Sequence, residues 1–280
     1  MSSCYTYTYM KKELNGAEIA GYVKERQAKA VRGLKQQWGV APKLAIIRTN
    51  PDPIVDSYMR IKQNYGADIA VEVGVHTIEQ NKALELIQKL NSDETVHGII
   101  VQIPLPDKTQ TDEILNAVVA EKDVDGLGQN SRFDAPTPVA IHWLLSGYDI
   151  QLYGKKVVLV GQGRLVGAPL SRLWEKSVIE HDKVDNSTPN LTNILQEADV
   201  IVSATGVAGL IQTDMVKPDA IIVDAGVATD SNGLIGDVDE AVRALPGVII
   251  TPLKGGVGPL TVAALFENVI SAARLTIKNK

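Results

Sequence analysis

A tyrosine and a lysine stand four residues apart in the string DSYMRIK, shortly after the turn Asn50-Pro51-Asp52-Pro53. The prolines fit the first turn of a helix, on which Tyr58 and Lys62 would share one face. A lysine transfers protons near neutral pH only when burial or neighbouring groups lower its pKa, and a tyrosine hydroxyl is a suitable hydrogen-bond partner. The spacing therefore allows a proton-transfer site or a solvated lysine above a packed tyrosine.

Polar side chains lie at and after the end of a later apolar strand pattern. Gln102 comes after four apolar residues in HGIIVQIPLP, and Asp123 and Asp125 lie in the loop EKDVDGLG. Ligands bind at the carboxyl ends of strands in α/β sheets, where a carboxylate can hold an amino-substituted heterocycle through two hydrogen bonds. The alternatives are an amide satisfied by the sheet edge and a solvated acidic loop.

Two glycine-rich turns allow the backbone to approach a ligand closely. The apolar run Val157–Val160 predicts a buried strand, and Gly161, Gly163 and Gly167 then lead into a helix with the spacing GxGxxxG. Such a turn admits a pyrophosphate, whose charge the helix N-terminus favours. The second turn, Gly255–Thr261 (GGVGPLT), also precedes a helix. An ordinary strand-to-helix turn and a helix cap are the alternatives.

The composition excludes several classes of function. The 280 residues are 45% hydrophobic and 22% charged, with a net charge of −5, as in a soluble protein of two domains. Without a basic patch, neither nucleic acid nor a membrane is expected as a partner. The single Cys4 allows no internal disulfide and fits the cytoplasm, and there is neither an apolar run of about 18 residues nor a signal-peptide core. The four histidines lack metal-ligand spacing, so no metal is expected.

Alternating helical and strand patterns position these residues in the first half of the chain. They predict helices over Gly16–Trp38, Lys82–Leu90 and Thr111–Val119, a helix carrying DSYMRIK, and strands at Lys43–Arg48, Ile69–Val75 and Gly98–Ile103. This alternation is typical of a mostly parallel sheet covered by helices.

The alternation resumes after a connecting segment. Pro138 is expected to open a helix over Val139–Leu145, followed by a linker over Gly147–Gly154. Later strands are predicted at Lys156–Val160, Val178–Val184, Asp199–Ala204, Ala220–Ala225 and Val248–Thr251, with a last apolar helix over Leu260–Lys278. We therefore expect an α/β fold of two domains: residues 1–147 with 262–280, since the last helix crosses back, and a Rossmann-type parallel-sheet domain of residues 148–261.

The order of the motifs resembles that of the methylenetetrahydrofolate dehydrogenase/cyclohydrolase family. DSYMRIK, HGIIVQIPLP, KDVDGLG, PTP, the glycine turn, GDVD at Gly236–Asp239 and TPLKGGVGPLT follow one another in the family's order. The resemblance implies a folate-binding domain, a Rossmann-type domain for NAD or NADP, and an active site between them. It implies oxidation of 5,10-methylenetetrahydrofolate to the methenyl form and hydrolysis to 10-formyltetrahydrofolate, in a cytoplasmic homodimer of one-carbon metabolism that serves purine biosynthesis.

The resemblance also assigns expected roles to individual residues. Lys62 matches the lysine that manages proton transfer during hydrolysis, and Tyr58 matches its helix partner, which stacks on the folate. Gln102 matches the amide that tunes the lysine, and Asp125 matches the carboxylate that holds the pterin ring. The turn along the substrate and nicotinamide corresponds to Gly258 and Pro259, and the dinucleotide is expected at Gly161, Gln162, Gly163, Arg164, Gly167, Asp185, Thr205 and Gly206.

Departures from the family pattern bear on the cofactor. GQGRLVG stands for the usual GRSxxVG, so Gln162 and Gly163 replace an arginine and a serine, and Asp185 begins the stretch that usually reads HSxT. An acidic residue at the end of the second strand favours a free ribose 2'-hydroxyl and repels a 2'-phosphate, which favours NAD over NADP. Arg164 or Lys183 could still meet a phosphate. Lys254 replaces a usual proline for no reason evident in the sequence.

Other functions stay open at this point. A monofunctional dehydrogenase of the same family and a shikimate-dehydrogenase-like oxidoreductase share the two-domain plan. The altered glycine turn also suggests a catalytically silent ligand-binding paralogue. A short-chain dehydrogenase is disfavoured, because its YxxxK motif follows the glycine turn, whereas here the motif precedes it.

Overall fold

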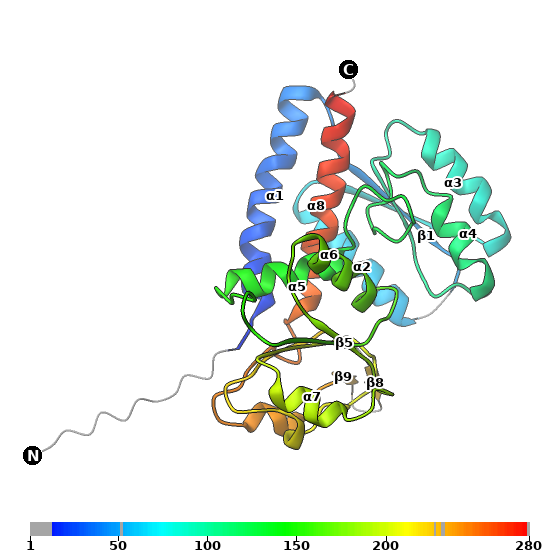
Figure 1. Cartoon of the computed structure of the whole chain (residues 1–280). Helices are drawn as coiled ribbons and strands as arrows, with labels where there is room; N and C mark the ends of the chain where they lie inside the picture. The colour runs from blue at the N-terminus through cyan, green and yellow to red at the C-terminus, as the bar shows by residue number, and fades with distance from the viewer. Residues whose placement is uncertain (1–12, 51–52, 227, 231–232, 279–280) are drawn as a thin grey trace, which may run out of the picture.

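The computed structural model describes residues 13–50, 53–226, 228–230 and 233–278 (Figure 1). They form an α/β molecule with two separate parallel sheets, which confirms the predicted fold class. The first sheet belongs to the N-terminal part of the chain and the second sheet to the part that follows helix α5 (Pro136–Gly147).

The first sheet has three parallel strands in the order β2-β1-β3. β1 (Lys43–Arg48) lies between β2 (Glu72–Thr77) and β3 (Gly98–Val101). The four inner residues of β1 are buried, because a central parallel strand is covered on both faces. Gln102 follows β3 directly and therefore lies at the carboxyl edge of this sheet.

Helices connect and cover these strands. They are α1 (Gly16–Trp38), α2 (Pro53–Asp68), α3 (Ala83–Ser92), α4 (Thr111–Asn116) and α5 (Pro136–Gly147), with 3-10 turns η1 (Gln80–Lys82) and η2 (Lys108–Gln110). α1 has the predicted bounds because both of its ends are capped. The Asn15 side chain accepts hydrogen bonds from the amides of Ala17 and Glu18, and Gly39 ends the helix with φ 65°.

The second sheet has five parallel strands in the order β10-β7-β6-β4-β5. They are β4 (Val157–Val160), β5 (Asp182–Val184), β6 (Val200–Ser203), β7 (Ile221–Asp224) and β10 (Ile249–Ile250). Also in this part are α6 (Gly167–Lys176), α7 (Leu191–Glu197), the hairpin β8 (Ala228–Asp230) and β9 (Gly233–Ile235), and turns η3 (Thr213–Met215) and η4 (Glu240–Ala244). The strand order reverses at β4, which is where open α/β sheets bind ligands.

The last helix, α8 (Val257–Lys278), returns to the first part and lies beside α1 (Figure 1). Gln27 of α1 donates a 2.8 Å hydrogen bond to the Ala263 carbonyl, and Phe266 stacks on Tyr65 of α2 with ring centroids 5.0 Å apart. By length and composition, Val257–Ile277 could cross a membrane, although no apolar run of about 18 residues is expected from the sequence. In this fold α8 is instead a packing helix against α1, α2 and α5.

One cluster of buried side chains runs through both parts of the molecule. It includes Leu44 of β1 and Phe266 of α8, and also Leu159 of β4 and Trp174 of α6. The two parts therefore share a continuous hydrophobic core, to which α5 and α8 both contribute.

Two predicted strands begin too early. The strand expected at Ile69–Val75 begins at Glu72, because Ala70 takes a left-handed φ of 62° in the turn that closes α2. The strand expected at Val178–Val184 begins at Asp182, because Val178 has a φ of 57° in the turn after α6. In both places the apolar residues that follow the helix were assigned to the strand, although they lie in the turn before it.

The helix expected to open at Pro138 opens at Pro136. Both prolines occupy its first turn, where a backbone N–H is not needed. α5 also extends to Gly147, which was predicted to start the linker.

Candidate functional site

Lys62 lies on the stripe of α2 that faces the interior. Val55, Met59 and Gly66 are the neighbouring buried positions of this stripe, and Lys62 falls three residues after Met59 and four before Gly66. The helix period therefore carries the lysine inward, although its side chain is only half-buried overall. Tyr58, on the adjacent edge of the same face, is 42% exposed and available to a ligand.

Gln102 is oriented so that its side-chain oxygen faces the lysine. Its backbone amide donates to the Ile47 carbonyl at 2.9 Å, which fixes the residue beside β1. Its side-chain amide donates to the Ile103 carbonyl at 3.1 Å, and the Lys62 ammonium donates to its Oε1 at 3.2 Å. The polar strand-end residue and the helix lysine, far apart in sequence, thus form one group.

The two aspartates of the acidic loop have different surroundings. Asp123 is buried and accepts hydrogen bonds from the amides of Gly126 at 3.1 Å and Gly128 at 2.8 Å, so it holds the loop in shape. Asp125 lies close enough to Lys62 for each charge to affect the ionisation of the other. Of the two carboxylates, Asp125 therefore belongs to the lysine group.

Burial controls the ionisation of this group. Removal from water lowers the pKa of Lys62 below its ordinary value of 10.5, and the negative charge of Asp125 opposes that shift. Burial likewise raises the pKa of Asp125, with Lys62 opposing and Asp123 reinforcing the shift. The lysine can consequently release and recover a proton more readily than a solvated lysine.

The glycine turn after β4 is packed too closely for side chains at two of its three glycines. Gly161 has a φ of 97°, and a Cβ there would lie 2.6 Å from the Ala204 carbonyl oxygen. A Cβ on Gly167 would lie 1.9 Å from the Gly161 carbonyl oxygen, whereas a Cβ on Gly163 would meet nothing within 4 Å. The first and third glycines therefore bring the start of α6 against the turn, and the open middle fits a dinucleotide phosphate.

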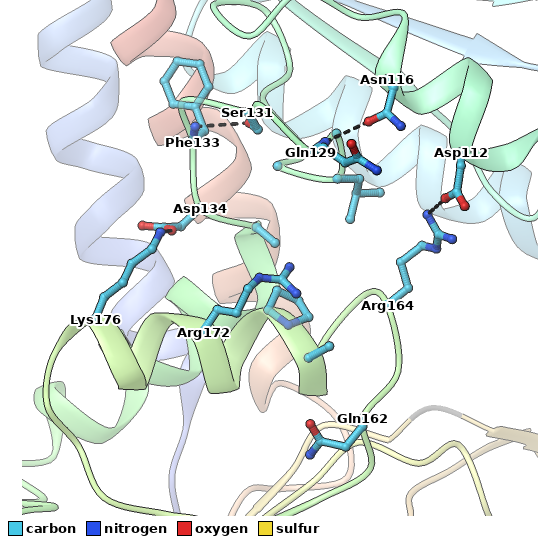
Figure 2. Close-up of a pocket in the computed structure, with 16 residues that line it drawn as sticks. Asp112, Asn116, Gln129, Ser131, Phe133, Asp134, Gln162, Arg164, Arg172 and Lys176 are labelled. Carbon is cyan, nitrogen blue, oxygen red and sulfur yellow. Dashed lines mark hydrogen bonds and ion pairs between the residues drawn. The ribbon is translucent and has the colours of Figure 1, made fainter.

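A cavity of about 610 Å³ lies between this turn, α6 and the loop that follows Asp125 (Figure 2). Arg164 pairs with Asp112 of α4 at one side of the cavity, and Lys176 pairs with Asp134 at 3.2 Å on the other, with Arg172 between them. The predicted residues Gln162 and Arg164 line it, while Tyr58, Lys62, Gln102 and Asp125 do not. Arg172 and Lys176 were not predicted, because surface cations on an amphipathic helix carry no distinguishing pattern.

Asp185 lies just after β5, at the edge of the second sheet. Its Oδ1 accepts hydrogen bonds from the Ser187 hydroxyl at 2.7 Å and the Ser187 amide at 2.8 Å, and these bonds hold the pKa of this carboxyl below its ordinary value. Lys183, one of two cations that could meet a phosphate, pairs instead with Glu175. Arg164, the other cation, pairs with Asp112.

The other predicted ligand contacts lie at the ends of β6 and α8. Thr205 follows β6 and donates its amide to Asp237 at 2.6 Å. Gly206 has a φ of 70°, and a Cβ added at Gly206 or at Gly258 would meet no atom within 4 Å. Gly258 and Pro259 form the first turn of α8. The backbone at Gly206, beside the second sheet, and at Gly258, where α8 begins, is therefore open to a ligand.

Comparison with known proteins decides the family. The family model described as tetrahydrofolate dehydrogenase/cyclohydrolase, catalytic domain, matches residues 14–125, and the NAD(P)-binding domain of the same family matches residues 135–277. This chain belongs to the tetrahydrofolate dehydrogenase/cyclohydrolase family.

Relatives of the family match almost the whole chain. The bifunctional protein FolD of Staphylococcus aureus is 37% identical over 94% of this chain and 97% of its own length. A crystal structure of the bifunctional enzyme FolD from Campylobacter jejuni is 33% identical, with a TM-score of 0.89 over 95% of this chain and 99% of that one. The Trypanosoma brucei FolD complexed with NADP and an inhibitor is 26% identical, with a TM-score of 0.88 over 95% and 98%.

Family membership disfavours the shikimate-dehydrogenase-like alternative, because both parts of the chain match the folate family. In residues 13–50, 53–226, 228–230 and 233–278, no group of three or more His, Cys, Asp or Glu side chains could hold a metal ion. The GDVD string carries no expected role for Asp237 beyond its place in the family order, whereas in the structure Asp237 accepts a hydrogen bond from the Thr205 amide.

Proposed function

We propose that this member of the family oxidises 5,10-methylenetetrahydrofolate to the methenyl form with a nicotinamide dinucleotide and then hydrolyses the product to 10-formyltetrahydrofolate. The observation that carries the proposal is the Lys62 ammonium, turned inward and hydrogen-bonded to Gln102 at 3.2 Å beside Asp125. The full-length relatives named bifunctional FolD proteins support both activities and disfavour a dehydrogenase alone.

In this proposal Lys62 moves the proton during hydrolysis. Its lowered pKa provides a fraction of neutral amine that can accept a proton from the attacking water, and Gln102 holds the amine in place. Asp125 offers two oxygens to the amino-substituted pterin, and Tyr58 offers an exposed ring on the same helix face. These residues bind, orient and move a proton without forming a covalent bond to the folate.

The dinucleotide supplies the hydride acceptor when bound. Gly161, Gly163 and Gly167 would hold its pyrophosphate, since the close packing of the first and third leaves the middle of the turn open. Thr205 and Gly206 would face it from the end of β6, and Gly258 and Pro259 would lie between it and the folate. The protein then contributes position and exclusion of water.

We further propose that NAD is preferred to NADP. The exposed Asp185 carboxylate would accept hydrogen bonds from a free ribose hydroxyl and repel a phosphate, and Arg164 and Lys183 are both engaged in ion pairs. Initial rates of methylenetetrahydrofolate oxidation with NAD and with NADP at equal concentration test this. We expect the NAD rate to be at least about tenfold higher, because each lost charge-assisted contact changes binding by about that factor.

The same measurement tests the parent proposal. Reduced dinucleotide followed by methenyl and then formyl folate is the expected course. Turnover with NADP alone would contradict the NAD preference, and folate binding without reduction of either dinucleotide would indicate a silent binding protein instead.

We also propose the division of the chain into residues 1–147 with 262–280 and residues 148–261. The packing of α8 against α1 and α2 supports the assignment of the last helix to the first domain. A homodimer in the cytoplasm, supplying one-carbon units for purine biosynthesis, agrees with the family. Sedimentation velocity of the purified chain would measure the oligomeric state.

A further inference from the structure

A fully buried carboxylate lies beneath the turn that follows β6. Asp237, of the GDVD string, is 0% exposed, and its Oδ2 accepts hydrogen bonds from the Ser203 hydroxyl at 2.7 Å and the Thr205 amide at 2.6 Å. Its Oδ1 is also buried and has no hydrogen-bond partner within the described part of the chain. Burying a carboxylate that is only half satisfied is costly, so a fold retains it where it performs a task.

A second carboxylate holds the first in place. Asp224 ends β7, and its Oδ1 accepts hydrogen bonds from the amides of Gly226 and Asp237, both at 3.1 Å. Its Oδ2 accepts from the Val238 amide at 3.2 Å, and the Arg243 guanidinium lies 3.7 Å away. Burial beside another carboxylate raises the pKa of Asp224 to about 6.

Each carboxylate occupies the space beside a glycine, Asp237 beside Gly226 and Asp224 beside Gly236, so neither glycine could carry a side chain. A Cβ on Gly226 would lie 1.9 Å from the Asp237 Oδ1, and a Cβ on Gly236 would lie 1.9 Å from the Asp224 Oδ2. The end of β7 and the segment after β9 are therefore interlocked, and Asp237 extends the interlock to the end of β6. This explains why glycine stands directly before Asp237 and two residues after Asp224.

We propose that Asp224 and Asp237 are positioning residues for the dehydrogenase reaction, whose interlocked carboxylates fix the Thr205–Gly206 backbone so that it faces the dinucleotide. Asp237 holds the Thr205 amide, while the next residue, Gly206, is unobstructed, since a Cβ there would meet no atom within 4 Å. The inference rests on the proposed placement of the dinucleotide at these two residues. It involves no contact with Lys62, so the hydrolysis step should not depend on it.

The two activities give the test an internal control. In Asp237→Ala we expect the dissociation constant for NAD, measured calorimetrically without folate, to rise by at least about tenfold, because the Thr205 turn loses a charge-assisted bond. Hydrolysis of methenyltetrahydrofolate supplied directly, without dinucleotide, should stay within about twofold of wild type. Asp237→Asn, which keeps one acceptor oxygen, should recover part of the affinity.

Asp239→Ala is the matched control, since the Asp239 side chain caps η4 by accepting a hydrogen bond from the Ala241 amide at 2.9 Å. It should change neither measurement. If Asp237→Ala does not fold, Ser203→Ala removes one of the two donors to Asp237 and should weaken NAD binding while preserving hydrolysis.

An unchanged NAD dissociation constant in folded Asp237→Ala would overturn the inference, as would parallel losses of NAD binding and hydrolysis, which indicate a general structural role. A wild-type protein that neither binds NAD nor hydrolyses methenyltetrahydrofolate would instead refute the proposed function. The two failures are therefore distinguishable.

Discussion

The pKa of Lys62 is lowered because its position on α2 lies on the face of that helix that is turned to the interior. The same side chain one position earlier or later would leave the interior-facing stripe and behave as a solvated cation. Its partners Gln102 and Asp125 come from two other segments, and only Asp125 carries a charge that changes the pKa of the lysine.

Replacing the lysine tests this at the scale of one residue. In Lys62→Met we expect hydrolysis of methenyltetrahydrofolate to fall by about 10²–10⁴-fold, the usual contribution of a positioned acid or base. Folate binding, followed by calorimetry, should survive because Asp125 and Tyr58 remain. Wild-type hydrolysis in this variant would remove Lys62 from the mechanism.

The charge of Asp125 should be visible in the titration of the same lysine. Because the carboxylate opposes the lowering of the Lys62 pKa, Asp125→Asn should move that pKa further down. NMR titration of ε-carbon-labelled lysine in the ligand-free protein measures it. An upward movement, or none, would contradict the assigned coupling.

Tyr58, Lys62 and Asp125 could be selected from the sequence because helix spacing is a local property and the order of the motifs resembles that of a known family. The interlock of Asp224 and Asp237 could not, because it depends on how strands β6 and β7 pair and on two glycines that pack against carboxylates. A buried, structurally engaged aspartate has no spacing that distinguishes it from a loop aspartate.

Among the elements, the turn between β4 and α6 contains both close-packed and open glycine positions. Gly161 and Gly167 are close-packed, and Gly163 is open. The extra residue in GxGxxxG is therefore accommodated without loosening the contact between the helix start and the turn.

Two alanine substitutions distinguish these roles. Gly167→Ala should lower the melting temperature and weaken NAD binding, because its Cβ would overlap the Gly161 carbonyl and push α6 away. We expect a cost of about 1–3 kcal/mol in the free energy of unfolding. Gly163→Ala, measured by the same denaturation, should stay within about 1 kcal/mol of wild type; equal destabilisation by both would refute the packing argument.

Helices and strands could be predicted with correct bounds where particular residue types, such as helix-capping residues, mark their ends. β1 and α1 have the predicted bounds, and Asn15 and Gly39 show why for the helix. The starts of β2 and β5 were wrong because Ala70 and Val178 adopt left-handed conformations that nothing in their residue types indicates. The hairpin of β8 and β9 was missed because each strand is too short to show alternation.

For the whole molecule, the shared core predicts that both activities are lost together on unfolding. Phe266→Ala should lower the free energy of unfolding by about 3–5 kcal/mol, because the ring is fully buried against Tyr65. In urea, dehydrogenase activity, hydrolase activity and helical dichroism should decline at one lower midpoint.

Tyr153→Ala, at a side chain that is 96% exposed, is the control and should leave that midpoint unchanged. Loss of one activity well before the other in Phe266→Ala would show that the two parts unfold separately despite the common cluster.

The contact between α1 and α8 has a consequence for how the protein is made. Gln27 meets the carbonyl of Ala263, a residue 236 positions later in the chain. During translation at roughly 5–20 residues per second, α1 leaves the ribosome more than ten seconds before its packing partner exists. The apolar face of the N-terminal helix is thus exposed throughout the synthesis of the Rossmann-type sheet, so chaperone capture of the nascent chain should concentrate on α1 and end when α8 emerges.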